Sequence, residues 1–186
     1  EEAFRNASLV VPSPGVPPSL EPIKRAGEAG ADVVSELEFS SQYCQSRTLA
    51  VTGTNGKTTT TELLRCLVAA CGHDVILAGN NNIPFSTAVM ADPPPPFIVL
   101  EISSYQLELI RTFRPWIATV LNVTPDHLAR HGTIEGYAAA KARIFENQAQ
   151  GDFSVINRDD TYARAMKAPA DATVWNYSLN EKVERG

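Results

Sequence analysis

The sequence predicts an α/β fold in which helices flank a mostly parallel sheet. From Thr48 onward, short apolar runs alternate with helix-like amphipathic stretches, as successive strand and crossover-helix units require. The run Phe-Ile-Val-Leu at 97–100 is apolar without interruption, which is typical of a parallel strand covered on both faces. A glycine-containing turn at 53–56 joins the first strand to the first helix. Together these observations indicate an α/β protein with a phosphate-binding loop (P-loop).

Local signals bound each expected element. Residues 9–11 form an apolar run that stops at a Pro-Ser-Pro-Gly turn, and 19–29 suit a helix that ends at Gly30. Gly72 is expected to cap the first helix of the main sheet, and the prolines at 93–96 indicate an extended loop. We expect strands at 48–52, 75–78, 97–102, 117–122 and 153–157, and helices at 57–71, 84–90, 104–111 and 133–148.

The element order also predicts a domain organisation. One strand, one turn and one helix cannot bury a core alone, so residues 1–35 are expected to close a neighbouring domain whose beginning is absent. Residues 36–47 would then be a linker, and 48–186 a central domain that is incomplete at its C-terminal end. The chain has neither an initiating Met nor a signal peptide, so we expect a fragment of a cytoplasmic protein.

The composition excludes several partners. A chain of 186 residues that is 44% apolar can bury a globular core. Its net charge of -5, with acidic and basic residues interspersed, gives no basic stripe, so nucleic acid is not an expected partner. No apolar stretch approaches the roughly 20 residues that cross a bilayer, so no membrane span is expected. The three cysteines lack metal-ligand spacing, which indicates reduced thiols.

The string Thr-Gly-Thr-Asn-Gly-Lys-Thr-Thr at 52–59 is the sharpest chemical signal. Its glycines let backbone N–H groups turn toward an anion, and the N-terminus of the following helix adds positive potential. Lys57 can neutralise a terminal phosphate, and the Thr58 hydroxyl can bind magnesium. The first glycine, Gly53, stands three residues before Gly56, whereas in the more common phosphate-loop pattern the two glycines are five residues apart. The alternative is a tight strand-to-helix turn with a solvated lysine.

Polar residues follow the expected strands where a ligand would lie. In an open α/β sheet, ligands bind beyond the carboxyl ends of the strands. Asn80, Glu101, Asn122, Asp126 and His127 each lie at or shortly after such an end, so together with Lys57 they are expected to line one cleft.

Glu101 and His127 each admit two interpretations. A carboxylate that ends a buried strand is costly unless it is paired, and magnesium would offset that cost. Glu101 could instead cap the helix that begins at Ser103 and Ser104. His127 could be a metal ligand, a proton-transfer group or an ordinary loop histidine.

Lys141 stands on the apolar stripe of the helix expected at 133–148. It lies seven residues after Ile134 and four before Phe145, on the stripe that also holds Tyr137. Burial lowers an amine's pKa, and a neutral amine can react with carbon dioxide to form a carbamate, a carboxylate able to bind magnesium. The alternative is a lysine that reaches solvent or pairs with Glu135. Periodicity alone favours this alternative.

Taken together, these strings resemble the Mur ligases, whose phosphate loop reads Gly-x-x-Gly-Lys-Ser/Thr, as 53–58 does here. The resemblance covers nearly the whole chain. Three further segments look like the member that adds D-glutamate: Leu-Glu-Ile-Ser-Ser-Tyr-Gln-Leu at 100–107, Leu-Asn-Val-Thr-Pro-Asp-His-Leu at 121–128, and 137–145. The resemblance also implies that a partial Rossmann-like N-terminal domain precedes the P-loop domain.

The resemblance implies the residues of the site. ATP phosphates would contact the loop, with Lys57, His127 and Lys141 acting in catalysis, the last as a carbamate formed with CO₂. Two Mg²⁺ ions would be held by Thr58, Glu101, His127 and the Lys141 carbamate. The phosphate-binding residues would be Gly53, Thr54, Asn55, Gly56, Lys57, Thr58 and Thr59. The substrate-binding residues would be Ser13, Gly15, Asn80, Ser103 and Gln106.

The implied reaction joins D-glutamate to UDP-N-acetylmuramoyl-L-alanine through an acyl phosphate, in a monomeric enzyme of three domains. The third domain would lie outside this chain, so the fragment alone is expected to be inactive. Two departures from the family pattern are Asn82, where a glycine is usual, and Ala129, where an aspartate is usual. The alternatives are a related ligase such as folylpolyglutamate synthase, a P-loop module without ligase activity, and a truncated paralogue.

Overall fold

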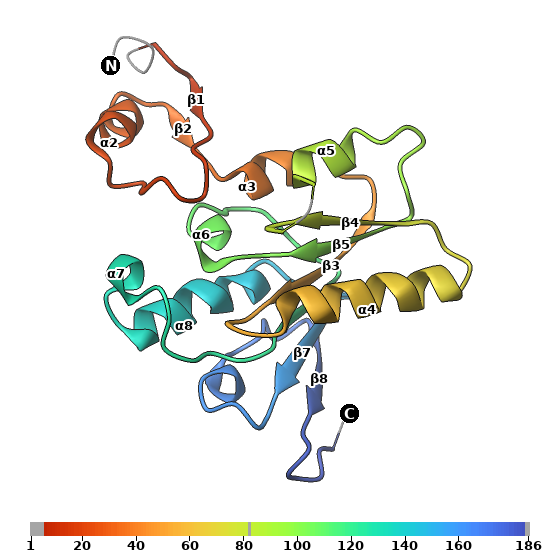
Figure 1. Cartoon of the computed structure of the whole chain (residues 1–186). Helices are drawn as coiled ribbons and strands as arrows, with labels where there is room; N and C mark the ends of the chain where they lie inside the picture. Colours follow the sequence, from red (N-terminus) through yellow and green to blue (C-terminus); the bar gives the residue numbers. More distant parts are fainter. Residues whose placement is uncertain (1–5, 82, 185–186) are drawn as a thin grey trace.

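The computed structural model describes residues 6–81 and 83–184, and it confirms the expected α/β fold (Figure 1). A six-stranded sheet has the order β4-β5-β3-β6-β7-β8, and all of its pairings are parallel. The strands are β3 (Arg47–Thr52), β4 (Val75–Gly79), β5 (Phe97–Glu101), β6 (Ile117–Val120), β7 (Phe153–Asn157) and β8 (Thr173–Tyr177).

The centre of the sheet is as apolar as the sequence predicts. Residues Ile98, Val99 and Leu100 of β5 are fully buried, because α4 covers one face of the sheet while α5, α6 and α8 cover the other. The helices are α4 (Lys57–Ala70), α5 (Phe85–Val89), α6 (Ser104–Leu107), α7 (Leu128–His131) and α8 (Ile134–Ala142). Gly72 follows α4 with a φ of 81°, as a C-terminal cap requires.

Two expected helix boundaries are wrong, and one strand of the main sheet is missed. The helix expected at 104–111 ends at Leu107, since the chain then turns to bury Ile110 and Phe113 in the core. The helix expected at 133–148 ends as α8 at Ala142 and continues as the 3₁₀ turn η1 (Arg143–Phe145). The expected strands also miss β8, while a second 3₁₀ turn, η2 (Ala163–Ala165), precedes it.

The segment 36–47, expected to be a linker, contains the helix α3 (Glu36–Ser41). Ser35 caps it, because the Ser35 side chain accepts a hydrogen bond from the backbone N–H of Glu38. Leu37 joins the main hydrophobic core. This segment therefore packs as part of the body of the molecule rather than as a free connection.

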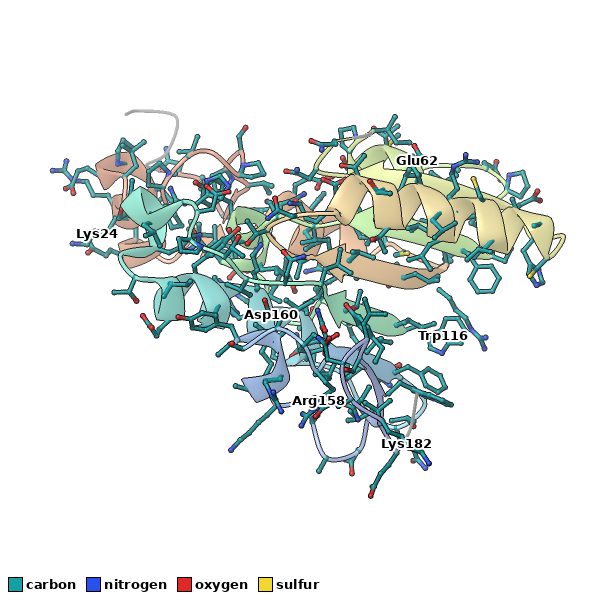
Figure 2. All side chains as sticks on the ribbon, turned by 60° about the horizontal axis from the view of Figure 1, so that its bottom comes forward. Lys24, Glu62, Trp116, Arg158, Asp160 and Lys182 are labelled. Atoms are coloured by element: carbon teal, nitrogen blue, oxygen red, sulfur yellow. The ribbon has the colours of Figure 1, made fainter. Side chains whose placement is uncertain are left out.

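The N-terminal residues form a small unit beside the main sheet, as the two views in Figure 1 and Figure 2 show. Strands β1 (Leu9–Val10) and β2 (Asp32–Val33) pair in parallel, and α2 (Glu21–Glu28) connects them. Its buried cluster consists of Val10, Ala26 and Ala31. The sequence correctly predicts the first strand and the helix, but not β2.

One face of the sheet is only partly covered beyond β3. Along β6 and β7, buried residues alternate with partly exposed ones, and α4 lies over β3, β4 and β5 instead. A largely apolar cavity of about 430 Å³ lies there, lined by residues that include Leu64, Ile117, Val155 and Tyr177. Within the described ranges, no helix is long and apolar enough to cross a bilayer.

Candidate active site

The P-loop wraps around the start of α4. Gly56 caps the helix with a φ of 82°, and Gly53 has a φ of 151°. A Cβ added to Gly53 would lie 3.1 Å from the Cβ of Leu121, so the loop can pass β6 this closely only with glycine there. The Lys57 ammonium folds back over the loop and donates to the backbone oxygens of Gly53 (3.1 Å) and Thr54 (3.0 Å).

The end of β6 holds this loop in place. The Asn122 side chain accepts from the Asn55 backbone N–H (2.9 Å) and donates to the Asn55 carbonyl (3.0 Å). The Asn122 carbonyl accepts from the Thr54 N–H (3.0 Å). Thr124 adds a backbone N–H donated to the Thr54 hydroxyl at 3.1 Å. The loop is thus fixed from a neighbouring strand end.

Glu101 lies directly beside the P-loop helix and is fully buried. Its carboxylate accepts from the Thr58 hydroxyl at 2.8 Å and from the Asn80 side-chain amide at 3.2 Å. The alternative role, capping the helix α6, is filled by Ser103, whose hydroxyl accepts from the backbone N–H of Gln106 in a capping box. Glu101 therefore faces the P-loop and does not cap α6.

A close backbone contact sets the position of Glu101. Gly79 ends β4 opposite Glu101, with a φ of 105°. Any Cβ on Gly79 would collide with the Glu101 carbonyl oxygen. The next residue, Asn80, then donates its backbone N–H to that same carbonyl at 2.9 Å.

Lys141 is 1% exposed, which excludes the alternative in which it reaches solvent. Its ammonium donates to the Gly53 carbonyl at 2.9 Å and lies 4.4 Å from the centre of the Tyr137 ring. Burial, together with the nearby charge of Lys57, lowers the pKa of Lys141 to about 7, although Asp126 acts in the opposite direction. A large share of this amine is therefore neutral at physiological pH.

His127 occupies an unusual backbone position immediately before α7. It has a φ of 51°, and its side chain is 47% exposed. Its ring lies 5.1 Å from the Tyr105 ring and 5.9 Å from the Tyr137 ring. The Asp126 carboxylate lies 3.5 Å from His127 Nε2, and Asp126 Oδ1 accepts the His127 backbone N–H at 2.8 Å.

Two cavities contain the three expected catalytic residues and four of the five expected substrate-binding residues. The first, of about 200 Å³, is lined by Lys57, Asn80, Ser103, Ser104, Tyr105, His127, Tyr137 and Lys141. The second, of about 370 Å³, lies between the N-terminal unit and the main sheet and includes Ser13, Asn80 and Gln106. Asn80 lines both, so the two cavities meet at the end of β4. Gly15 lines neither cavity, and Glu101 lies behind Asn80 and Thr58.

Some expected residues have a second, structural task. The Gln106 side chain accepts from the backbone N–H and hydroxyl of Ser103 (2.9 and 3.1 Å). Both residues thus build the N-terminus of α6. Asn82 lies outside the described residues, so its departure from the family pattern is not tested, but the neighbouring Asn81 donates to the Thr58 hydroxyl at 3.1 Å. Ala129 lies in α7.

Several residues of the site were not singled out from the sequence. Tyr137 was expected only as an apolar contact, yet its ring separates Lys141 from His127. Asn122 was noted only as a strand-end residue, although it fixes the P-loop. Ser104 and Tyr105 follow a strand end, and this position is the signal by which the sequence could have identified them as site residues.

The donors near Thr58 suit a hard divalent cation. The Thr58 hydroxyl and the Glu101 carboxylate are oxygen ligands of the kind that fit Mg²⁺ when substrate phosphates and water complete its coordination. Asn80 and Asn81 turn their side-chain NH₂ groups toward these two oxygens and so donate hydrogen bonds to them. In the part of the chain that the structure describes, no group of three or more His, Cys, Asp or Glu side chains forms a complete metal site. Any ion here therefore needs ligands from a substrate, from water or from a modified lysine.

A parallel sheet with a glycine loop and a lysine at the start of its first long helix defines this chain as a P-loop α/β protein. Comparison with known proteins then places it in a family. The profile described as Mur ligase middle domain matches residues 51–185. The chain belongs to the Mur ligase family.

Two curated relatives carry the same ligase name. The chain is 45% identical over 181 residues to the UDP-N-acetylmuramoylalanine–D-glutamate ligase of Pelotomaculum thermopropionicum, covering 97% of this chain and 40% of the relative. It is 42% identical over 186 residues to the protein of that name from Thermoanaerobacter pseudethanolicus, covering 100% of this chain and 41% of the relative. The chain thus spans about two fifths of the length of these relatives.

Solved structures share the fold at low identity. The MurF ligase of Thermotoga maritima, in complex with ADP, matches with a TM-score of 0.61 and 20% identity, over 93% of this chain and 50% of that one. A ligase from Neisseria meningitides, described as UDP-N-acetylmuramate:L-alanyl-gamma-D-glutamyl-meso-diaminopimelate ligase, has a TM-score of 0.63 and 16% identity, over 91% and 58% of the two chains. These matches establish the fold.

Proposed function

We propose that this chain is the nucleotide-binding part of an ATP-dependent ligase that joins D-glutamate to UDP-N-acetylmuramoyl-L-alanine during peptidoglycan precursor synthesis. The observation that carries this proposal is the cavity where the P-loop lysine, Lys57, meets the buried Lys141 and His127. The similarity to ligases named for this reaction selects the substrates.

In this proposal ATP binds with its phosphates on the loop 53–59. The loop lies around the N-terminus of α4, which favours anions. The N–H groups of Thr54 and Asn55 are bonded to Asn122, so the phosphates would contact the first turn of α4, where Lys57, Thr58 and Thr59 lie. Lys57 then moves from the carbonyls that it contacts to the terminal phosphates. The neighbouring T. maritima MurF structure, which contains ADP, is consistent with such a site in this fold.

We further propose two Mg²⁺ ions. Thr58 and Glu101 would hold one between the P-loop and β5, while Glu101, His127 and a modified Lys141 would hold the other. When bound, the ions would offset the charge of the phosphates and of the attacking carboxylate. The full burial of Glu101 supports this role, since a carboxylate beside a phosphate site otherwise repels the nucleotide.

The modification of Lys141 is a carbamate. The neutral amine attacks CO₂, a C–N bond forms as one C=O π bond opens to an oxyanion, and one N–H proton leaves to solvent, which converts the neutral amine into a carbamate anion. The lowered pKa of Lys141 makes the neutral amine available near pH 7. A carbamate at this position would also exchange the repulsion between Lys141 and Lys57 for attraction.

The UDP-sugar would occupy the cavity between the N-terminal unit and the main sheet. Ser13 and Gly15 lie on the turn that we assign to its diphosphate, and residues 1–35 would close the first domain. Asn80, Ser103 and Gln106 would face the muramoyl-alanine part. The substrate carboxylate would then reach the first cavity at Asn80, which lines both.

The chemistry follows from this arrangement. The substrate carboxylate attacks the γ-phosphorus of ATP, an O–P bond forms, and ADP leaves. The amine of D-glutamate then attacks the acyl carbon, a C–N bond forms, and phosphate departs. Lys57 counters the charge that develops on the transferring phosphoryl group, so positioning and electrostatic stabilisation replace a covalent nucleophile of the protein.

The test measures ADP release by the full-length protein with Mg²⁺ and UDP-N-acetylmuramoyl-L-alanine, comparing D-glutamate with L-glutamate, L-alanine and diaminopimelate. Release that depends on D-glutamate supports the proposal. Release that requires a different amino acid or a folate substrate would assign the chain to a related ligase. Release that ignores every amino acid would leave only a P-loop nucleotide hydrolase.

The proposed enzyme also has an expected location, oligomeric state and domain content. We infer a cytoplasmic monomer, in which a further domain supplies the amino-acid site, so that the 186-residue polypeptide alone binds nucleotide but completes no turnover. Sedimentation of the full-length protein, together with ADP release by the isolated polypeptide, tests both statements.

A further inference from the structure

A buried histidine outside the expected site joins the helices around His127. The His131 side chain is 5% exposed, and its Nε2 shares a hydrogen bond of 2.9 Å with the hydroxyl of Ser104 at the start of α6. Its ring stacks against Tyr105 (5.6 Å, 24° between the planes) and lies 5.2 Å from the Tyr137 ring. His131 therefore contacts α6 and α8 at once, although it belongs to α7.

The helix that carries His131 is too short to be stable without side-chain contacts. It spans only Leu128–His131, and none of its four residues is buried as a whole. His127 directly precedes it in a left-handed conformation. A helix this short has almost no stability of its own, so side-chain contacts must hold it.

The contacts of α7 with α6 come from its last two residues. Arg130 forms an ion pair with Glu108 (2.7 Å) and lies over the Tyr105 ring, while Glu108 Oε1 is 3.7 Å from His131 Nδ1. Arg130 also donates to the Val16 carbonyl of the N-terminal unit at 3.3 Å. The end of α7 is thus tied down, and His127 is placed at its other end.

We propose that His131 is a positioning residue that fastens α7 to Ser104 and thereby holds His127 at the cavity wall. This inference rests on the proposed function, in which His127 binds Mg²⁺. His131 touches neither nucleotide nor metal in this arrangement. It acts through Ser104 and through the rings of Tyr105 and Tyr137, both of which also contact His127.

The experiment uses the full-length protein and a fluorescent ADP derivative, whose binding is followed as Mg²⁺ is titrated. His131→Phe keeps an aromatic ring but removes the hydrogen bond, and Ser104→Ala removes the partner with a smaller change. Each variant should raise the Mg²⁺ concentration at half-saturation about 10-fold or more, the usual range for lost support of a metal ligand. The double variant should be no weaker than either single one, because both remove the same contact.

The controls separate positioning from folding. His131→Gln, which keeps a hydrogen-bonding side chain, should recover part of the Mg²⁺ affinity. His73→Phe alters an exposed histidine that packs on Phe97 at the opposite ends of the strands, and should change nothing. A variant that lowers the thermal midpoint but leaves the Mg²⁺ requirement unchanged would show a merely structural role and overturn the inference, as would additive effects in the double variant.

A further variant separates this inference from the proposed function. If His127→Ala weakens Mg²⁺ binding but His131→Phe and Ser104→Ala do not, the positioning role is wrong and the metal site stands. If His127→Ala leaves Mg²⁺ binding unchanged, the metal role of His127 is wrong, and the role of His131 falls with it.

Discussion

At the scale of single residues, burial of polar groups governs this site. Lys141 and Glu101 are both excluded from water, yet each has partners, and within the described residues no buried side-chain polar atom lacks a hydrogen-bond partner. Such satisfaction is typical of folded proteins. Burying Lys141 and Glu101 costs free energy. In the proposed enzyme, both groups are ones whose charge would act on the bound substrate.

Lys141→Ala should lower ADP release by the full-length protein by roughly 10²- to 10³-fold, the loss expected when one electrostatic stabiliser of a transition state is removed. Short carboxylic acids such as acetate should restore part of the rate, since they can enter the vacated space as a free carboxylate. A matched Lys167→Ala variant, which changes an exposed lysine, should behave as the wild type. Full activity of Lys141→Ala would contradict the carbamate.

Gly79→Ala should destabilise the protein by more than about 3 kcal/mol, since the new Cβ collides with the Glu101 carbonyl in addition to the cost of its backbone conformation. Gly72→Ala is the matched control. Gly72 has a similar positive φ of 81° but open space around it, so it should cost only about 1 kcal/mol. Urea unfolding of the polypeptide compares the two, and equal losses would show that the collision does not matter.

At the scale of elements, a buried carboxylate attaches α3 to the core. Glu38 is 1% exposed and accepts the backbone N–H groups of Arg111 (2.8 Å), Thr112 (3.0 Å) and Phe113 (2.9 Å). These three N–H groups follow α6 in the chain and belong to no helix. The Glu38 carboxylate thus accepts the backbone hydrogen bonds of the whole turn at 111–113, which explains why the segment expected to be a linker is firmly packed.

Glu38→Gln should cost about 2 kcal/mol of stability, because a neutral amide replaces charge-assisted hydrogen bonds. Burial raises the pKa of Glu38, but the hydrogen bonds from Arg111, Thr112 and Phe113 outweigh it, so the net pKa is lowered. With a folded pKa below the unfolded one, this contribution is complete above the unfolded pKa and is lost as the pH falls through the folded pKa.

Urea unfolding of wild type and Glu38→Gln between pH 3 and pH 7 checks this expectation. The difference between the two proteins should be largest near pH 7 and should shrink at acid pH. Glu28→Gln, which changes an exposed glutamate of α2, is the control and should show no such pH dependence. A difference that stays constant with pH would mean that the Glu38 charge contributes nothing.

At the scale of the whole molecule, periodicity and turn signals predict the parallel sheet and its helices, because strands such as β5 are buried uniformly. They miss β2, α3, α7 and β8, since two- to six-residue elements with mixed polarity carry no periodic signal. The P-loop is readable because consecutive residues build it. The partnership of His131 with Ser104, or of Glu38 with the turn at 111–113, joins residues far apart in sequence and needs the fold.

The two parts of the molecule differ greatly in the size of their cores. The buried cluster of the N-terminal unit consists of Val10, Ala26 and Ala31, whereas the main core holds twenty buried residues of the described chain. The contacts of the unit with the main body include the exposed Arg111–Asp32 ion pair (2.8 Å), a bond from Arg111 to the Val33 carbonyl (3.4 Å) and one from Arg130 to the Val16 carbonyl. Exposed ion pairs add little stability, so the unit should open independently of the sheet.

Hydrogen exchange of the 186-residue polypeptide tests this independence. Backbone amides of β1 and β2 should exchange at least about 100-fold faster than those of β3 and β5, which corresponds to about 3 kcal/mol in opening free energy. Arg111→Ala should accelerate exchange in β1 and β2 further while leaving β5 unchanged, because the ion pair bridges the two parts and supports neither core. Equal protection throughout, or acceleration in β5, would show instead that the molecule opens as one cooperative body. The opening matters for the proposed enzyme, since the cavity that contains Ser13 and Asn80 lies between the two parts, and a UDP-sugar that binds there should slow exchange in β1 and β2.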